Sequence, residues 1–242
     1  MTSSKIEWTD STWNPISGCT KISAGCQNCY AARMAKRLQL MGSLRYKNGF
    51  KVTIHEDLFD APLQWKKPRI IFVNSMSDLF HEEIPEKTIH QLFRIMAKAS
   101  QHTFQILTKR AERLYELAPR LEWPSNIWMG VTVESESYAY RIELLKKIPA
   151  AVKFISFEPL LSGIDASHSL HGIDWIIVGG ESGPNARPMK AEWARALQKM
   201  AQSYNAAFFF KQWGGTNKKK AGRMLDGREW NAMPQIKAFC NL

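Results

Sequence analysis

The 242-residue chain contains no apolar run long enough to cross a membrane, which argues against a membrane-spanning protein. Its first eight residues also lack the apolar core of a secretory signal. An intracellular, cytoplasmic protein with no membrane partner is therefore expected. No internal repeat, long low-complexity tract or break in composition marks a second domain, so we expect a single domain over residues 1–242.

Acidic residues are scarce relative to basic ones. The chain has 22 Asp and Glu against 33 Lys and Arg, which gives a net charge of +11. This excess is more than solubility requires and favours a polyanionic partner, with nucleic acid (DNA or RNA) the first candidate. The alternative is a surface that is merely basic. The excess is scattered, with local clusters at residues 66–69, 109–110 and 218–220.

Cysteine is also rare, and its placement is uneven. Of four cysteines, Cys19, Cys26 and Cys29 follow the spacing C-x6-C-x2-C, and Cys240 is third from the end. In an intracellular protein, clustered cysteines more often indicate metal or redox chemistry than structural disulfides. No fourth cysteine or histidine lies nearby in the sequence, since the nearest histidine is His55.

Three chemical interpretations of these cysteines remain open. Three thiolates suit a four-iron, four-sulfur cluster (4Fe-4S) and leave one iron free to bind a substrate or cofactor. A structural zinc site usually has four protein ligands, so Cys240 would have to fold back to complete it. Three ordinary reduced thiols are the remaining alternative. The density of the cysteines argues against ordinary thiols, and the lack of a nearby fourth ligand favours the iron–sulfur cluster over zinc.

The pattern of apolar runs predicts an α/β fold with a partial or near-closed (β/α) barrel of about six or seven parallel strands. Short, mostly continuous apolar runs are typical of parallel strands that are covered on both faces. They occur at residues 69–74, 104–108, 127–133, 152–157, 175–178 and 207–211, with one more around 12–16. Amphipathic segments at 84–99, 111–117, 136–147 and 191–204 alternate with them, and a helix is expected at 31–40.

In such barrels the functional residues lie at the carboxyl ends of the strands. Polar residues follow each apolar run, at 74–78, 108–110, 132–135, 158–159, 179–183 and 211–213. Glu134, Glu158 and Glu181 would need partners if they point inward. The alternative for each is that it caps a helix or pairs with a nearby lysine or arginine. The glycines at 179–183 allow the backbone to approach a ligand, but their spacing does not fit a phosphate-binding loop.

The cysteine loop, expected at residues 18–30 between the first strand and the first helix, resembles that of the radical S-adenosylmethionine (radical SAM) enzymes. The chain is more closely similar to a phage-associated three-cysteine family described as a domain of unknown function. The phrases that carry this resemblance are Trp-Asn-Pro at 13–15, Gly-Cys-Thr at 18–20, the stretch at 25–31, Phe-Glu-Pro-Leu at 157–160, Gly-Gly-Glu-Ser-Gly at 179–183 and Lys-Gln-Trp-Gly at 211–214.

The resemblance implies an enzyme with a 4Fe-4S cluster held by Cys19, Cys26 and Cys29, whose open iron binds S-adenosylmethionine. An electron donor protein would then drive cleavage of the cofactor to a radical. Residues 74–81 match the second strand end of that superfamily, and Thr132, Glu134 and Arg141 fall where its fourth strand contacts the cofactor. With the other strand ends, the cofactor-binding candidates are Asn74, Ser75, Asp78, Thr108, Lys109, Thr132, Glu134, Arg141, Glu158, Gly179, Gly180 and Glu181.

Two features depart from the superfamily pattern. The common spacing is C-x3-C-x2-C, whereas the first gap here is six residues. Asn28 stands where an aromatic residue usually precedes the last cysteine, and Tyr30 lies on the other side of it. The longer gap extends the loop without changing the number of thiol ligands.

The C-terminal part suggests a substrate class. Aromatic and basic residues interleave there, which is typical of proteins that hold an unstacked base. We expect a basic surface lobe at 213–242 and substrate contacts from Lys211, Gln212 and Trp213, while Phe208 and Phe210 read as a buried strand. The hypothesis is a radical repair or modification of a nucleic-acid base or sugar. The alternatives are a non-catalytic nucleic-acid-binding module with structural zinc, or a radical SAM enzyme acting on a peptide or small molecule. A partner protein could contribute to the substrate site.

Overall fold

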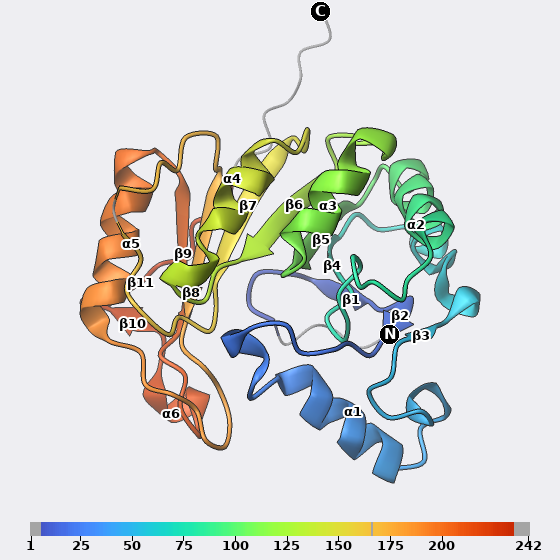
Figure 1. Ribbon diagram of the computed structural model, residues 1–242, viewed down its shortest axis with the longest axis horizontal. Coiled ribbons are helices and arrows are strands. Elements are labelled where there is room, and N and C mark those ends of the chain that lie inside the picture. The colour runs from blue at the N-terminus through green and yellow to red at the C-terminus, as the bar shows by residue number, and fades with distance from the viewer. Residues whose placement is uncertain (1–5, 166, 235–242) are drawn as a thin grey trace, which may run out of the picture.

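Seven parallel strands form one sheet in the computed structural model, which describes residues 6–165 and 167–234 (Figure 1). The spatial order of the strands is their order along the chain, β1-β4-β5-β6-β7-β8-β9. β1 and β9 are the two edges, so the sheet is a half-barrel, as the sequence predicted in its partial form. The strands are β1 Ser11–Trp13, β4 Ile70–Val73, β5 Thr103–Thr108, β6 Ile127–Thr132, β7 Val152–Phe157, β8 Trp175–Gly179 and β9 Ala207–Gln212.

Four helices cover one face of this sheet (Figure 1). They are α2 Glu86–Lys98, α3 Ala111–Leu117, α4 Tyr140–Lys146 and α5 Ala191–Ser203. In α2, Glu86 lies in the first turn and Lys98 in the last, which complements the helix dipole at both ends. Strand-to-helix crossovers of this kind account for the parallel pairing of sequential strands. No helix of the described part is long and apolar enough to span a membrane.

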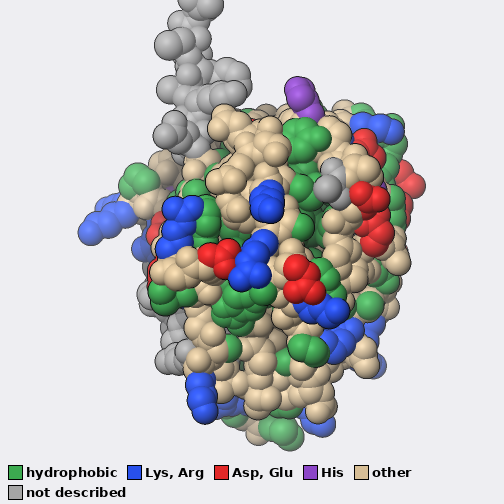
Figure 2. Space-filling view, turned by 90° about the vertical axis from the view of Figure 1, so that its left-hand side faces the viewer, with side chains coloured by type: hydrophobic (Ala, Val, Ile, Leu, Met, Phe, Trp, Pro, Cys, Tyr) green, Lys and Arg blue, Asp and Glu red, His purple; other side chains and the backbone are tan. Residues whose placement is uncertain are grey.

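Residues 213–234 form a small lobe beside α5. This lobe contains α6 Lys218–Ala221 and a hairpin of β10 Met224–Leu225 with β11 Arg228–Glu229. Arg195 of α5 pairs with Asp226 in the hairpin turn at 2.8 Å. Figure 2 shows Lys and Arg side chains interspersed with Asp and Glu on this side of the molecule. This face is therefore of mixed charge rather than uniformly basic. Cys240 lies outside the described residues.

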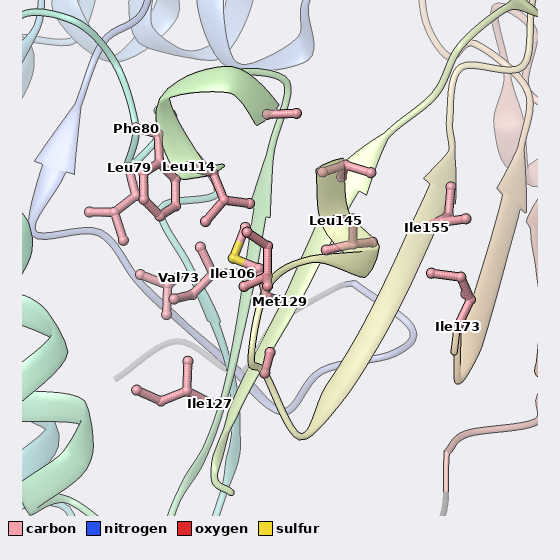
Figure 3. Packing of buried hydrophobic residues seen from close by; sticks show 14 of the residues in the cluster. Val73, Leu79, Phe80, Ile106, Leu114, Ile127, Met129, Leu145, Ile155 and Ile173 are labelled. Atoms are coloured by element: carbon pink, nitrogen blue, oxygen red, sulfur yellow. The ribbon is translucent and has the colours of Figure 1, made fainter. Parts of the chain in front are cut away.

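The main hydrophobic core lies between the sheet and the helices that cover it. Figure 3 shows its central part, where strand side chains such as Val73, Ile106 and Met129 meet helix side chains such as Leu114 and Leu145. All five are buried. The apolar runs read from the sequence are the strands of this layer, which explains why their positions could be predicted.

A second apolar cluster fills the opposite, inner face of the half-barrel. It contains Trp8, Trp128, Phe154, Trp175 and Phe209. Trp8 precedes β1, and its carbonyl accepts a hydrogen bond from the buried Gln105 side chain. The inner face is therefore packed mainly with aromatic rings from Trp8 and the strands, with the polar Gln105 side chain among them.

Helix α1, Tyr30–Leu40, lies apart from the other helices (Figure 1). It follows the cysteine loop, as predicted for residues 31–40. A short antiparallel pair of β2 Ile16–Ser17 with β3 Thr53–Ile54 flanks this region. The remaining short turns are 3-10 helices, η1 Ala24–Cys26, η2 Leu44–Tyr46, η3 Glu56–Leu58, η4 Ala61–Gln64, η5 Ala118–Arg120 and η6 Glu136–Tyr138.

Candidate functional site

The cysteine loop, residues 18–30, starts from a tightly fixed backbone. Gly18 has φ +86° and pairs as an isolated β-bridge with Ser77, just beyond the end of β4. A Cβ at Gly18 would lie 2.1 Å from the Lys51 carbonyl oxygen, so no other residue fits here without movement. The Cys19 N–H donates to the Phe50 carbonyl at 3.1 Å. The first cysteine is thus held between two neighbouring segments.

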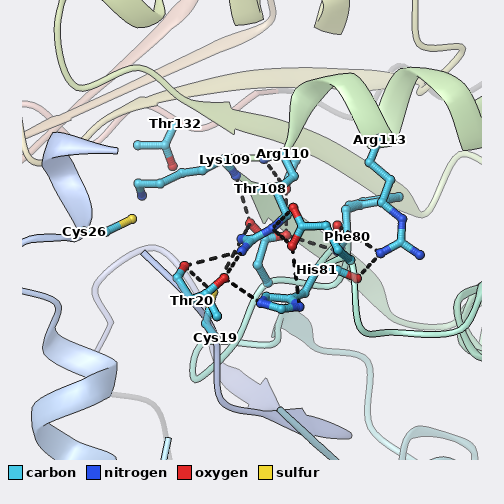
Figure 4. A network of polar contacts seen from close by, with 12 residues as sticks. Cys19, Thr20, Cys26, Phe80, His81, Thr108, Lys109, Arg110, Arg113 and Thr132 are labelled. Atoms are coloured by element: carbon cyan, nitrogen blue, oxygen red, sulfur yellow. Dashed lines mark hydrogen bonds and ion pairs between the residues drawn. The ribbon is translucent and has the colours of Figure 1, made fainter. Parts of the chain in front are cut away.

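Arg110, which follows β5, joins this loop to the strand ends (Figure 4). Its guanidinium is buried and donates to Cys19 Sγ at 3.4 Å and to Thr20 Oγ1 at 3.0 Å. The same group pairs with Asp78 at 3.3 Å and with Glu82 at 2.9 Å. A buried cation with two carboxylate partners is well compensated, so Arg110 is a firm anchor for the start of the loop.

Asp78, one of the predicted cofactor contacts, accepts hydrogen bonds from two neighbouring residues within the protein. Its Oδ1 accepts from the Thr108 hydroxyl at 2.7 Å and its Oδ2 from the Lys109 N–H at 3.0 Å. Behind Arg110, the buried His81 ring contacts Thr20 Oγ1 at 2.8 Å. Thr108 and Asp78 therefore position Arg110 and, through it, the cysteine loop.

The cysteine thiols differ in their electrostatic surroundings. Burial, with a further contribution from the Asp78 charge, raises the pKa of Cys19 to about 11, although Arg110 acts in the opposite direction. Burial also opposes ionisation of Cys26, but the Lys109 charge and hydrogen bonds from Ile22 and Ser23 outweigh it and lower the pKa of Cys26. Cys29 occupies the N-cap position of α1. Cys26 is therefore favoured over Cys19 as a thiolate.

The three sulfur atoms share one loop but do not converge. All three cysteines are free and partly buried, and the charges of Cys19 and Cys26 are close enough to influence each other. Within residues 6–165 and 167–234, no group of three His, Cys, Asp or Glu side chains is arranged to hold a metal ion. The donor set of three thiols still suits iron–sulfur chemistry. Binding a cluster would require the three sulfur atoms to come together between the points at which loop 18–30 is anchored.

Glu134, beyond the end of β6, holds the middle of the loop. It is fully buried and pairs with the buried Arg141 of α4 at 2.9 Å. Its other oxygen accepts hydrogen bonds from the Ser23 hydroxyl and, at 3.2 Å, from the Gly25 N–H. A Cβ at Gly25 would lie 2.8 Å from this carboxylate, so glycine permits the close approach. Arg141 also donates to the Thr132 carbonyl at 2.8 Å.

Glu181, beyond the end of β8, holds the last part of the loop. It accepts from the Asn28 side chain at 3.0 Å and from the backbone and side chain of Arg187, each at 2.9 Å. Arg187 itself donates to the Ala24 carbonyl at 3.0 Å. Burial alone would raise the pKa of Glu181, but the hydrogen bonds and charge of Arg187, together with Asn28, lower it to about 2. The carboxylate is therefore ionised at neutral pH.

The third rim glutamate does not touch the loop. Glu158, beyond β7, pairs with Lys211 of β9 at 2.8 Å, and the side chain of Gln212 donates to it at 3.2 Å. Gly180 lies beside them, and a Cβ there would be 2.0 Å from the Trp213 carbonyl. Glu134, Glu158 and Glu181 thus each pair with a lysine or arginine, which was the alternative to a functional role for each of them. Glu158 is the one of the three glutamates whose own side chain is partly exposed, at 20%, and its partner Lys211 is 15% exposed.

The remaining predicted residues have mainly structural contacts. Trp213 packs its ring against Phe210 at 4.9 Å, and its indole N–H donates to the Met224 carbonyl at 2.8 Å. Gln212 is buried and donates to Ser182 Oγ at 2.7 Å. Ser75 donates to the Asn14 side chain at 3.1 Å. Three buried polar atoms at this end of the sheet have no partner in the described part of the chain, namely Asn74 Nδ2, Arg141 Nε and Gln212 Oε1.

The sequence reasoning missed the residues that fix the loop. Arg187 and Asn28 were not candidates, and Arg110 was counted among the strand-end polar residues at 108–110 but not as a site residue. A recess of about 530 Å³ opens beside the first cysteine, and it is lined by Cys19, Thr20, Phe50, Lys51, Val52 and Glu83.

Fold and site together define an open, parallel β/α half-barrel with a three-thiol loop laid across the carboxyl ends of its strands. The chain belongs to the family described as "Protein of unknown function (DUF5131)", which it matches over residues 3–234. No curated protein matches it.

Three solved structures of spore photoproduct lyase are similar to the chain. One is a complex with dinucleoside spore photoproduct, at 12% identity and TM-score 0.45, covering 78% of this chain and 59% of that one. A cysteine-to-serine mutant is similar at 14% identity and TM-score 0.47, covering 84% of this chain and 63% of that one. A double mutant with bound AdoMet and dinucleoside spore photoproduct is similar at 13% identity and TM-score 0.43, covering 80% of this chain and 60% of that one. The chain spans about three-fifths of the length of these proteins.

Proposed function

We propose that this protein is a radical SAM-type enzyme that binds a 4Fe-4S cluster through Cys19, Cys26 and Cys29, with S-adenosylmethionine beside it. The observation that carries the proposal is the way the thiol loop is held. Arg110, Glu134 and Glu181 each reach it from a different strand end. A loop fixed by buried charges at three points is more than three incidental thiols require, and three thiols without a fourth ligand suit a cluster with one open iron.

When bound, the cluster would supply the electron for reductive cleavage of S-adenosylmethionine. The chain's own residues would bind and orient the cofactor. Lys211 and Glu158 form a partly exposed pair that offers a cation for a carboxylate and a carboxylate for an ammonium group. The unpartnered Asn74 Nδ2 and Gln212 Oε1 add a donor and an acceptor at the same end of the sheet. Buried polar atoms without partners are rare, which supports a ligand here.

We further propose a nucleic-acid base or sugar as the substrate, with repair or modification as the outcome. The net charge of +11 supports a polyanionic substrate. Phe208, Phe209 and Phe210 are all buried, so these three rings offer no surface on which a base could stack. Binding would therefore rest on cations rather than on an aromatic platform. The alternatives are a radical SAM enzyme that acts on a peptide or small molecule, and a non-catalytic nucleic-acid-binding module inside the cell with a structural zinc site.

The test is cofactor cleavage under anaerobic conditions. Protein reconstituted with iron and sulfide is incubated with S-adenosylmethionine and dithionite, and 5′-deoxyadenosine is quantified by chromatography. We expect release that is abolished in Cys26→Ala and retained in Cys240→Ala, the matched cysteine control. No release from an iron-loaded protein would overturn the proposed activity. Affinity for DNA or RNA that falls steeply with salt would support the substrate class, and its absence would contradict it.

A further inference from the structure

The segment that carries the thiol loop has an unusual charge composition. Residues 11–55 contain no Asp or Glu, but they contain Lys21, Arg33, Lys36, Arg37, Arg45, Lys47 and Lys51. Arg45 pairs with Asp57, and Arg33 donates to the Ser182 carbonyl. Lys36, Arg37, Lys47 and Lys51 are exposed and form no ion pair within the described residues. This segment therefore presents four cations that are not held in ion pairs with other described residues.

The same segment also exposes large apolar side chains. Tyr30 is 58% exposed, Leu40 80%, Met41 69% and Leu44 84%. Half of the exposed large hydrophobic residues of the described part lie between residues 22 and 44. Apolar side chains gathered in this way, rather than scattered singly, mark an interaction surface.

Helix geometry places these two kinds of residue together. Residues three and four apart share one side of a helix, so Tyr30, Arg37 and Met41 lie in one row with Lys36 and Leu40 beside them. The opposite side of α1 buries Ala31 and Ala35 against Met76. We call Tyr30, Lys36, Arg37 and Leu40 of α1, its C-cap residue Met41, and Leu44 of the adjoining η2 the α1 face. It is cationic and apolar, and in the described structure nothing covers it.

The chemistry of this face favours one class of partner. A second copy of the chain would bring another net charge of +11 against it. Nucleic acid would satisfy the cations, but contacts to phosphate and sugar are polar and would leave Leu40, Met41 and Leu44 uncovered. A protein with acidic groups around an apolar centre would satisfy both, since Tyr, Met and Arg are enriched at protein interfaces.

We propose that the α1 face docks a small acidic electron-carrier protein. Helix α1 starts directly after Cys29, and its exposed side runs for about 15 Å from there, so a protein seated on it would border the thiol loop. This assignment rests on the proposed function, because the carrier would give up one electron to the cluster and leave oxidised, with no bond made or broken. Electron-transfer encounters use small interfaces, which matches a single helix face.

The test uses an acidic flavodoxin as the probe and measures its affinity for the reconstituted protein by titration at several salt concentrations. The test variant reverses two charges of the α1 face, Lys36→Glu and Arg37→Glu. The control variant reverses two charges on the exposed side of α2, Lys87→Glu and Arg94→Glu, and therefore changes the net charge equally. The double variant Leu40→Ser with Met41→Ser tests the apolar part. Thermal midpoints and iron content show that each variant is folded and loaded.

We expect at least a tenfold loss of flavodoxin affinity in both α1 variants and less than a twofold loss in the α2 control. Equal losses in the two charge variants, or no flavodoxin binding to an iron-loaded protein that cleaves S-adenosylmethionine with dithionite, would overturn the docking proposal and leave the proposed function standing. Loss of duplex DNA binding instead of flavodoxin binding would assign the face to nucleic acid. A protein that takes up no iron would overturn the proposed function and the carrier with it.

Discussion

Replacing Glu134 with glutamine should destabilise the protein and loosen the cysteine loop. Glu134 and Arg141 are both buried and joined at 2.9 Å. Removing one partner of a buried ion pair costs about 3–5 kcal/mol, because the other charge stays buried without compensation. Glutamine retains an oxygen that can accept from Arg141 or from Gly25, so we expect a loss near the lower end, about 3 kcal/mol.

Urea and thermal unfolding measure this loss. For a chain of this size, about 3 kcal/mol corresponds to a fall in Tm of roughly 6–12 °C. The control is Glu143→Gln on α4, the helix that also carries Arg141. It removes the ion pair between the exposed Glu143 and Lys146 and should cost less than about 0.5 kcal/mol. Limited proteolysis should also cut residues 18–30 faster in Glu134→Gln than in the control. Equal stability of the two variants would refute the reasoning that Glu134 anchors the loop.

Two further perturbations test the packing and the rim charges. Gly130→Ala places a Cβ 2.4 Å from the Phe154 ring and should lower the free energy of unfolding in urea by about 1–3 kcal/mol. The control Gly163→Ala, whose Cβ would have its nearest neighbour at 3.4 Å, should be tolerated. Similar stabilities of the two variants would contradict this account. The pKa of Glu181 is depressed to about 2, so its pairing with Arg187 contributes stability above about pH 4.5 that is lost as the pH falls toward 2. The stability gap between wild type and Glu181→Gln should therefore shrink over that range, and a constant gap in unfolding midpoints would count against the pairing.

Much of the fold was readable because its strands are continuous apolar runs. The run at residues 152–157 is the strand Val152–Phe157, and helix Ala111–Leu117 has the predicted bounds. The pair of β2 with β3 was missed, since two-residue strands carry no periodic signal. A helix at 31–40 was also expected, but not that Tyr30 and Leu40 would face outward.

The site was readable in its residue types but not in its connections. The candidate strand-end polar residues lie at one edge of the sheet, because the carboxyl ends of parallel strands meet there. Their partners depend on tertiary placement. Glu134 contacts Gly25, 109 residues away, and Glu181 contacts Asn28, 153 residues away. No local pattern encodes such contacts. Trp213, predicted as a substrate contact, packs its ring on Phe210, a contact that a single sequence does not reveal.

Metal content is the most direct test of the central claim that Cys19, Cys26 and Cys29 hold an iron–sulfur cluster. Protein purified without oxygen and reconstituted with iron and sulfide is analysed for metal and for its absorption spectrum, together with the three single alanine variants and Cys240→Ala. The account predicts roughly four irons per chain, lost in the three loop variants and retained in Cys240→Ala. About one zinc and no iron would contradict it and would favour a metal-stapled binding module.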